Sequence, residues 1–233
     1  MKFALSNSAI VDCDFRSLVR RSSELGFNGV ELSNQLASSL GPSDVRSILA
    51  DASQHLACVC SSARFRGNAL ADNEAAAQVR DCLELAGHLG CHTVKLGDAE
   101  PNHRESVMTT ISRLANWLAP LADLAGDRGM TILIENGVTL STARPLWFLA
   151  EQLNHSAVGI CWNIQRSHSA GENPAVTVPT LNHRIRCVKT TQPDIREPLL
   201  RLKGIGYTGW IVFAGGASDA ETFINPLRSG RSP

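Results

Sequence analysis

The stretch Gly129-Met130-Thr131-Ile132-Leu133-Ile134-Glu135-Asn136 carries the strongest indication of how this chain folds. Its apolar and β-branched run is typical of a strand buried on both faces, and the Glu-Asn pair marks the polar end of that strand. Helical patterns flank the stretch, over about residues 104–128 before it and 143–153 after it. A buried strand between two helices predicts a parallel sheet, because parallel strands need a long crossover connection.

The same alternation of strand and helix recurs along the whole chain. We predict strands over residues 3–6, 29–32, 56–61, 93–96, 130–135, 158–162, 185–189 and 210–213. Helices are predicted at about 15–25, from Pro42 onward, and at 72–89, 104–128, 143–153, 176–181, 198–204 and 220–227. We expect Pro120 to kink or break its helix, residues 166–174 to form a polar loop, and 229–233 to form a frayed tail.

Eight strand–helix units predict a single-domain (β/α)₈ TIM barrel over residues 1–233. An open, doubly wound sheet is the rival arrangement. It would usually place a glycine-rich phosphate loop after the first strand, and Ser6-Asn7-Ser8-Ala9 is not such a loop. In a barrel, the functional side chains lie where the strands end and the following loops begin.

The composition limits the classes of partner. Lys plus Arg and Asp plus Glu both number 22, so no net basic field favours nucleic acid or an anionic membrane. The N-terminal segment turns polar too soon for a signal peptide, and no apolar run approaches the ~20 residues that span a bilayer. We therefore expect a cytoplasmic protein that acts on a small molecule.

Seven cysteines are scattered along the chain without a CxxC pair. Cys58 and Cys60 share one face of a predicted strand, and Cys161 and Cys187 fall in two others. An odd number of cysteines within strands predicts buried thiols in a reducing compartment. Disulfide and zinc sites are the less favoured alternatives.

Several segments together resemble one known family. The family is the xylose isomerase-like, sugar phosphate isomerase/epimerase family. Its third helix and fourth strand are similar to segment 83–94, and its fifth strand is similar to 129–136. Its sixth strand is similar to 158–164 with 171–174, and the approach to its eighth strand is similar to 206–210. The likeness extends over nearly the whole chain. It implies a TIM barrel, an isomerase or epimerase type of chemistry, and a possible homodimer.

The resemblance also implies a metal site that this sequence does not preserve. The family binds one divalent metal with a Glu, an Asp, a His and a second Glu at the ends of strands five to eight. At the matching positions this chain has Glu135, Asn163, Lys189 and Ala214, and Arg166 replaces a further family His. One carboxylate, one amide, an ammonium and a methyl group cannot hold a hard cation. We therefore predict that the protein binds no metal and no other cofactor. Because Ala214 replaces the second glutamate, we also predict that it does not epimerise a substrate with two glutamate bases.

Lys189 has three interpretations. Its ammonium could be a structural counter-ion for Glu135, an electrophile that polarises a substrate carbonyl, or the amine of a Schiff base. Lys95 is a competing candidate for the same roles, although a salt bridge with Asp98 at the barrel rim is the simpler prediction.

Glu135 and Lys189 are the predicted catalytic pair, with the carboxylate as base and the ammonium as electrophile. The alternative is a buried ion pair without chemistry. We predict substrate-binding roles for Glu31, Arg64, Arg66, Lys95, Asn163, Arg166, His168 and Glu172. The basic members would make the mouth of the barrel cationic and suit an anionic substrate, but arginines on loops are also ordinary solvated residues.

Two classes of function follow from the sequence. The first is a metal-independent isomerase or lyase that acts on a small polar, anionic, sugar-like or hydroxy/keto compound. The second is a non-catalytic relative that binds a ligand or a partner. Because barrels host both classes, the fold does not choose between them.

Overall fold

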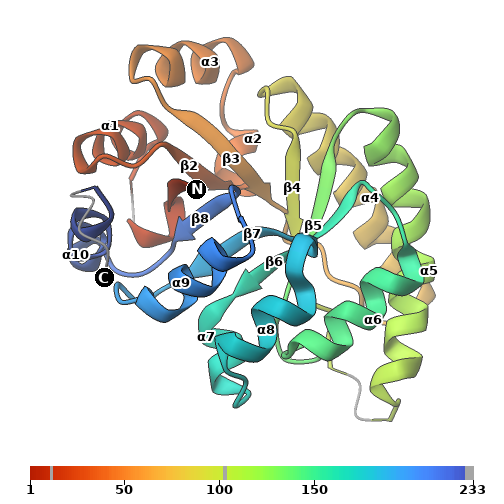
Figure 1. The fold of residues 1–233 in the computed structure, drawn as a ribbon. Coiled ribbons are helices and arrows are strands. Elements are labelled where there is room, and N and C mark those ends of the chain that lie inside the picture. Colours follow the sequence, from red (N-terminus) through yellow and green to blue (C-terminus); the bar gives the residue numbers. More distant parts are fainter. Residues whose placement is uncertain (11–12, 102–103, 229–233) are drawn as a thin grey trace.

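Within the described residues, 1–10, 13–101 and 104–228, eight parallel strands close into a barrel in the computed structural model (Figure 1). The strands are β1 (Lys2–Ser6), β2 (Gly29–Ser33), β3 (His55–Cys60), β4 (Thr93–Leu96), β5 (Thr131–Glu135), β6 (Val158–Asn163), β7 (Ile185–Thr190) and β8 (Trp210–Phe213). Each strand pairs with the next, and β8 pairs with β1. This closure confirms the predicted (β/α)₈ barrel and excludes the open sheet.

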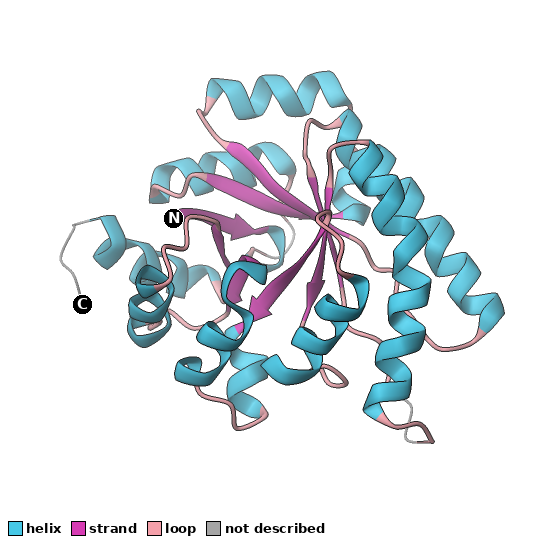
Figure 2. Cartoon of the chain, turned by 45° about the vertical axis from the view of Figure 1, so that its right-hand side comes forward, coloured by secondary structure: helices cyan, strands magenta, loops and turns pink. Residues whose placement is uncertain are grey.

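Helices surround the strands on the outside of the barrel (Figure 2). They are α1 (Phe15–Leu25), α2 (Asn34–Ser38), α3 (Pro42–Asp51), α4 (Ala69–His88), α5 (Val107–Asp127), α6 (Ala143–Leu153), α7 (Ile164–Ser169), α8 (Pro174–Leu181), α9 (Arg196–Gly204) and α10 (Ala217–Arg228), with 3₁₀ turns at Asn7–Ala9 and Asn182–Arg184. Most start where the sequence offers a cap: Asp14 and Ser106, for example, each accept a hydrogen bond from a backbone N–H in the first turn of the helix that follows.

Three local features differ from the predictions. Helix α5 continues through Pro120, so of the expected kink or break the break does not occur. The region predicted as a polar loop contains α7, whose N-terminus is capped by the Asn163 side chain. The short helix α2 was not predicted, although Ser33 accepts a hydrogen bond from Leu36 N at its start. The predicted tail, 229–233, lies outside the described residues.

The interior of the barrel is built in layers along the strands. An apolar layer consists of Ala4, Ala57, Leu133, Cys161, Cys187 and Val212. Two residues further along four of these strands come Ser6, Glu135, Asn163 and Lys189, and Ala214 follows directly after the end of β8. Because alternate residues of a strand face the same side, this second layer also faces inward, nearer the carboxyl ends of the strands. The alternation of the sequence thus places a polar layer on an apolar floor.

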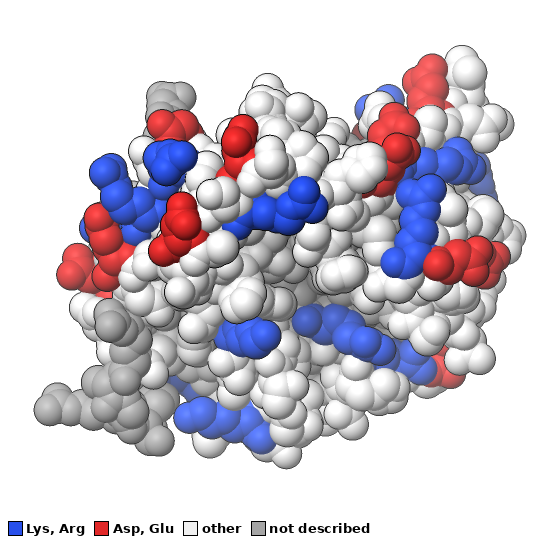
Figure 3. Space-filling view, turned by 90° about the horizontal axis from the view of Figure 1, so that it is seen from above, with Lys and Arg blue, Asp and Glu red and all other residues white. Residues whose placement is uncertain are grey.

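None of the described helices is long and apolar enough to cross a membrane. Basic and acidic side chains are interspersed on the face drawn in Figure 3, and neither sign covers it alone. This agrees with the equal numbers of acidic and basic residues in the sequence.

Candidate active site

Two glutamates and two lysines form a cluster of charges inside the barrel, at the carboxyl ends of the strands. Glu31 comes from β2, Lys95 from β4, Glu135 from β5 and Lys189 from β7. We call these four residues the charge cluster. They lie far apart in the sequence, and the closure of the barrel brings them together.

Lys95 is the central member of the charge cluster. Its Nζ atom lies 2.8 Å from Glu31 Oε2 and 2.8 Å from Glu135 Oε2. Lys189 contacts the same two carboxylates less closely, with Nζ 3.4 Å from Glu31 Oε1 and 3.8 Å from Glu135 Oε2. Two positive and two negative charges therefore balance within one connected network.

The four side chains differ in exposure. Glu31 and Lys95 are 2% and 3% exposed, whereas Glu135 and Lys189 are each 18% exposed. The first two thus form a buried ion pair, and the second two face an open space. An exposed member can meet a ligand, whereas a buried member acts through its neighbours.

Burial and ion pairing compete in setting the protonation states. Burial alone would raise the pKa of both carboxyl groups, but the ammonium groups of Lys95 and Lys189 lower the pKa of Glu135 and hold that of Glu31 well below its usual range. Burial opposes the charged form of the lysines, yet the Glu31 carboxylate raises the pKa of Lys189 and that of Lys95 well above the ordinary value. All four groups are therefore charged at neutral pH.

Polar neighbours complete the hydrogen bonds of the two carboxylates. Glu31 Oε1 accepts from Ser6 Oγ at 2.8 Å, and Glu135 Oε1 accepts from Asn163 Nδ2 at 2.8 Å. Asn163 also caps helix α7, because its Oδ1 accepts from the backbone N–H of Arg166. The amide thus holds Glu135 in place while it fixes the start of the next helix.

A cavity of about 300 Å³ opens above the charge cluster. Lys95, Glu135 and Lys189 belong to its wall, together with Arg64 and Arg166, which were also predicted from the sequence. Three cations of the predicted set, in addition to Lys95, therefore meet around one space.

Five predicted residues are not part of this wall. Glu31 and Asn163 instead hydrogen-bond within the charge cluster or to it, and the other three lie elsewhere. Arg66 is exposed and pairs with Glu100 at 3.1 Å. His168 lies on α7 beside a different surface hollow. The Glu172 carboxylate accepts hydrogen bonds from Ala143 N and from a threonine hydroxyl, so it closes the start of α6.

Lys95 and Asp98 do not form the predicted rim salt bridge. Lys95 points into the barrel, whereas Asp98 Oδ2 accepts from the backbone N–H groups of Thr139 and Leu140, at 2.6 and 2.8 Å. Burial raises the pKa of Asp98. Its Oδ1 is buried without a hydrogen-bond partner among the described residues, and the residue belongs to the cavity wall. Asp98 is thus a residue of the site, and the salt bridge with Lys95 that was predicted for it is absent.

The predicted buried thiols and two of the tryptophans serve mainly as core. Five of the seven cysteines are buried and all seven are free. Trp162 is fully buried and donates from Nε1 to Ser167 Oγ at 3.0 Å. Trp210 packs against the apolar layer of the barrel interior. No tryptophan belongs to the wall of the cavity.

Comparison with family models gives one match, over residues 19–222, to the xylose isomerase-like TIM barrel. The chain belongs to this family. Three solved structures illustrate the likeness. Their sequence identities to this chain are low, so the likeness shows a shared fold. An AP endonuclease, family 2, from Brucella melitensis is 15% identical with a TM-score of 0.83, covering 99% of both chains. The 3-keto-D-glucoside 4-epimerase from E. coli is 16% identical with a TM-score of 0.86, covering 98% of this chain and 99% of that one.

The third structure is a probable 3-DHS dehydratase from Bacillus anthracis. It is 13% identical with a TM-score of 0.80, covering 99% of this chain and all of the other. A comparison with curated protein sequences found no match. The family match identifies a xylose isomerase-like TIM barrel, and these neighbours share its fold.

The charge cluster does not fit the divalent metal that the resemblance implies. At the four matching positions, only Glu135 offers a carboxylate and Asn163 an amide, and the Asn163 amide nitrogen already donates to Glu135. Lys189 brings an ammonium within 3.8 Å of that carboxylate, and Ala214 brings no ligand atom. A cation there would face two ammonium groups instead of the anionic or imidazole ligands it needs.

Proposed function

We propose that this chain is a metal-independent isomerase or lyase that moves a proton next to a carbonyl group of a small anionic hydroxy or keto compound. Glu135 is the base, and Lys189 is the electrophile. The observation that carries the proposal is the division of the charge cluster by exposure. Glu135 and Lys189 are each 18% exposed at the cavity, whereas Lys95, in the same wall, is only 3% exposed and Glu31 lies behind the wall.

Glu135 is suited to take up a proton because it is ionised at neutral pH. Its lowered pKa makes it a weak base, so the negative charge that develops on the substrate needs strong stabilisation. The Lys189 ammonium, on the same side of the cavity, can donate a hydrogen bond to the carbonyl oxygen as it becomes an enolate oxygen. The protonated Glu135 can then return the proton to carbon or to a departing hydroxyl group.

The raised pKa of Lys189 argues against the Schiff-base alternative. Only a neutral amine attacks a carbonyl, and the Glu31 carboxylate favours the charged form of this lysine. Borohydride reduction of a mixture of protein and substrate should therefore leave Lys189 unmodified.

The substrate class follows from the cavity wall. Arg64 and Arg166 stand at the same cavity as Lys189. Guanidinium groups bind carboxylate or phosphate with paired hydrogen bonds, so an anionic group of the substrate would bind between them. The names of two structural neighbours, a keto-glucoside epimerase and a probable dehydratase, agree with chemistry next to a carbonyl.

A non-catalytic binding protein is the second candidate, and one observation favours it. Both oxygens of Glu135 already have partners, Asn163 on Oε1 and Lys95 on Oε2. The ion pairs are thus complete without a substrate, as a purely structural cluster would require.

Proton exchange into D₂O, followed by NMR, separates the two candidates. The chelator-treated protein is incubated with a panel of small hydroxy-ketones and keto acids that carry a carboxylate or a phosphate. We expect exchange next to the carbonyl of at least one compound, falling about 10²–10⁴-fold in Glu135→Gln and about 10²–10³-fold in Lys189→Met.

Matched controls are Glu84→Gln and Lys203→Met, which alter exposed residues of α4 and α9. Binding of a panel compound without exchange would favour the non-catalytic candidate. Activity that disappears on chelation and returns with a divalent metal would refute metal independence.

A further inference from the structure

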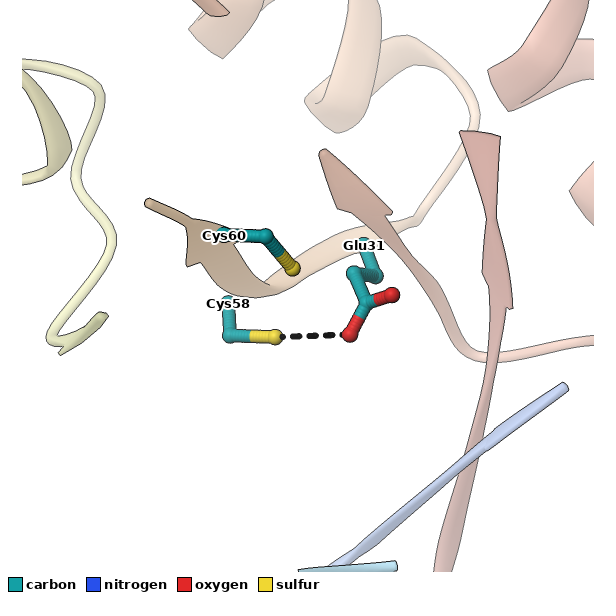
Figure 4. A group of neighbouring side chains, drawn as sticks. All are labelled: Glu31, Cys58 and Cys60. Atoms are coloured by element: carbon teal, nitrogen blue, oxygen red, sulfur yellow. Dashed lines mark hydrogen bonds between the residues drawn. The ribbon is translucent and has the colours of Figure 1, made fainter. Parts of the chain in front are cut away.

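Two cysteines and a glutamate converge beside the charge cluster. One ligand atom from each of Glu31, Cys58 and Cys60 lies within 4.8 Å of the other two. Figure 4 shows the three side chains turned toward one another, with Cys58 Sγ 3.2 Å from Glu31 Oε2. We call these residues the thiol cluster.

The local sequence and the strand register explain why these side chains meet. Cys58 and Cys60 are two residues apart on β3, so both face the same side of the strand. The register between β2 and β3 shifts after Val30, which pairs with Leu56, so that Glu31 pairs with Cys58. This irregularity places the carboxylate beside a thiol instead of beside Ala57.

The thiol cluster can be reached from the cavity. Cys60 is partly exposed and belongs to the cavity wall. Glu31 and Cys58 lie behind it and are buried. A small ion that enters the cavity would therefore meet Cys60 first and could then be enclosed by the two deeper ligands.

We propose that Glu31, Cys58 and Cys60 bind a thiophilic divalent cation of the Zn²⁺ type. Two sulfur ligands and one carboxylate oxygen suit Zn²⁺, and they do not suit Mg²⁺ or Ca²⁺, which prefer oxygen. A tetrahedral ion with ligands at about 2.0–2.3 Å needs them roughly 3.3–3.8 Å apart. Side-chain rotations that move the three ligand atoms by about 1 Å would bring them to that spacing. A water molecule from the cavity would fill the fourth position.

The charges of the neighbourhood allow this binding. The ion would replace the proton that Cys58 donates to Glu31 and the thiol proton of Cys60, so two protons leave as two positive charges arrive. The net charge beside Lys95 and Lys189 is therefore unchanged. The Glu31 oxygen that accepts from Cys58 also accepts from Lys95 at 2.8 Å, so the ion and the ammonium would share that oxygen.

This site is separate from the positions at strands five to eight, and its test does not depend on catalysis. Chelator-treated, reduced wild-type protein is titrated anaerobically with Co²⁺, an ion with the coordination preferences of Zn²⁺ and a visible spectrum. We expect a thiolate-to-cobalt charge-transfer band that saturates at one ion per chain, disappears on addition of Zn²⁺, and is accompanied by release of about two protons.

The variants assign the ligands. Cys60→Ser, which changes a partly exposed residue, should abolish the charge-transfer band, and so should Cys58→Ser. Cys13→Ser, a partly exposed cysteine outside the cluster, should leave the band intact. Circular dichroism of each variant establishes that the fold is retained.

Cobalt binding without a thiolate band would overturn the proposal, as would a band that persists in the folded Cys60→Ser protein. A saturated band in wild-type protein together with no exchange activity would refute the proposed enzyme and leave the thiol site standing.

Discussion

Replacing Lys95 with methionine should destabilise the protein strongly, because it removes a charged side chain that is almost fully buried. Lys95 makes two contacts of 2.8 Å, with Glu31 and with Glu135, and is 3% exposed. Its loss leaves two carboxylates, one fully buried, with only the longer contacts to Lys189 at 3.4 and 3.8 Å. Breaking a buried ion pair from one side costs about 3–5 kcal/mol, because the remaining charge stays buried without its partner.

A comparison of three variants measures this cost. Lys189→Met removes a lysine that is 18% exposed and whose ion pairs with Glu31 and Glu135 are longer, at 3.4 and 3.8 Å. We expect a loss of about 1 kcal/mol, the upper range for an exposed ion pair. Lys203→Met, on the exposed face of α9, should change nothing measurable. Urea unfolding followed by circular dichroism gives the three free energies of unfolding. Equal losses for Lys95→Met and Lys189→Met would refute the assignment of Lys95 as the central cation.

The pH dependence provides a second measurement on the same variants. The folded-state pKa of Glu31 and Glu135 is lowered, so their contribution is present above about pH 4.3, the unfolded value, and is lost as the pH falls through the folded pKa. The folded-state pKa of Lys95 is raised, so its contribution is complete below about pH 10.4 and is lost as the pH rises through the folded pKa. Wild-type stability should therefore be level between these limits. In Lys95→Met the loss of stability at acid pH should be smaller, because only Lys189 then lowers the pKa of the two carboxyl groups.

Two further substitutions test the surroundings of the site. Gly137→Ala would place a Cβ atom 2.6 Å from Asp98 Cβ and should cost about 1–3 kcal/mol by overpacking. The Cβ atom of Gly204→Ala would meet nothing within 4 Å, so that variant should be neutral or stabilising. Thermal unfolding of the two variants measures the difference in stability. Glu172→Gln replaces the carboxylate that accepts a hydrogen bond from Ala143 N at the start of α6, and so weakens that bond. The free energy of unfolding in urea should fall by about 0.5–2 kcal/mol. A variant as stable as the wild type would contradict this capping role.

The sequence was sufficient to predict the barrel because its strands carry two signals at once. Each is a short apolar run, and most are followed by a capping residue and a helical pattern. The local errors arose where a residue has two uses. Pro120 was expected to kink or break its helix, yet α5 continues through it from Val107 to Asp127. Asn163 was considered only as a site residue, although its side chain also caps α7.

The site was harder to predict than the fold, and Lys95 illustrates the reason. Its position in the strand, with Thr93 two residues before it, fixes which side of the sheet it faces, but only the closed barrel shows that this side is the interior. The sequence placed Asp98 close by, and a contact between neighbours in sequence was the natural prediction. The true partners, Glu31 and Glu135, are 64 and 40 positions away, and no local pattern connects them.

The charge cluster changes what the barrel can do. The resemblance implies a divalent cation held by carboxylates, and here two ammonium groups supply the same charge of +2 to Glu31 and Glu135. A metal accepts lone pairs from substrate oxygens, whereas an ammonium only donates hydrogen bonds. Lys95 has both carboxylates within 2.8 Å, so Lys189 is the better placed of the two to donate to a ligand in the cavity. In the proposed function, the replacement therefore keeps the electrostatic balance of the site, and the ammonium groups act by hydrogen bonding and proton transfer.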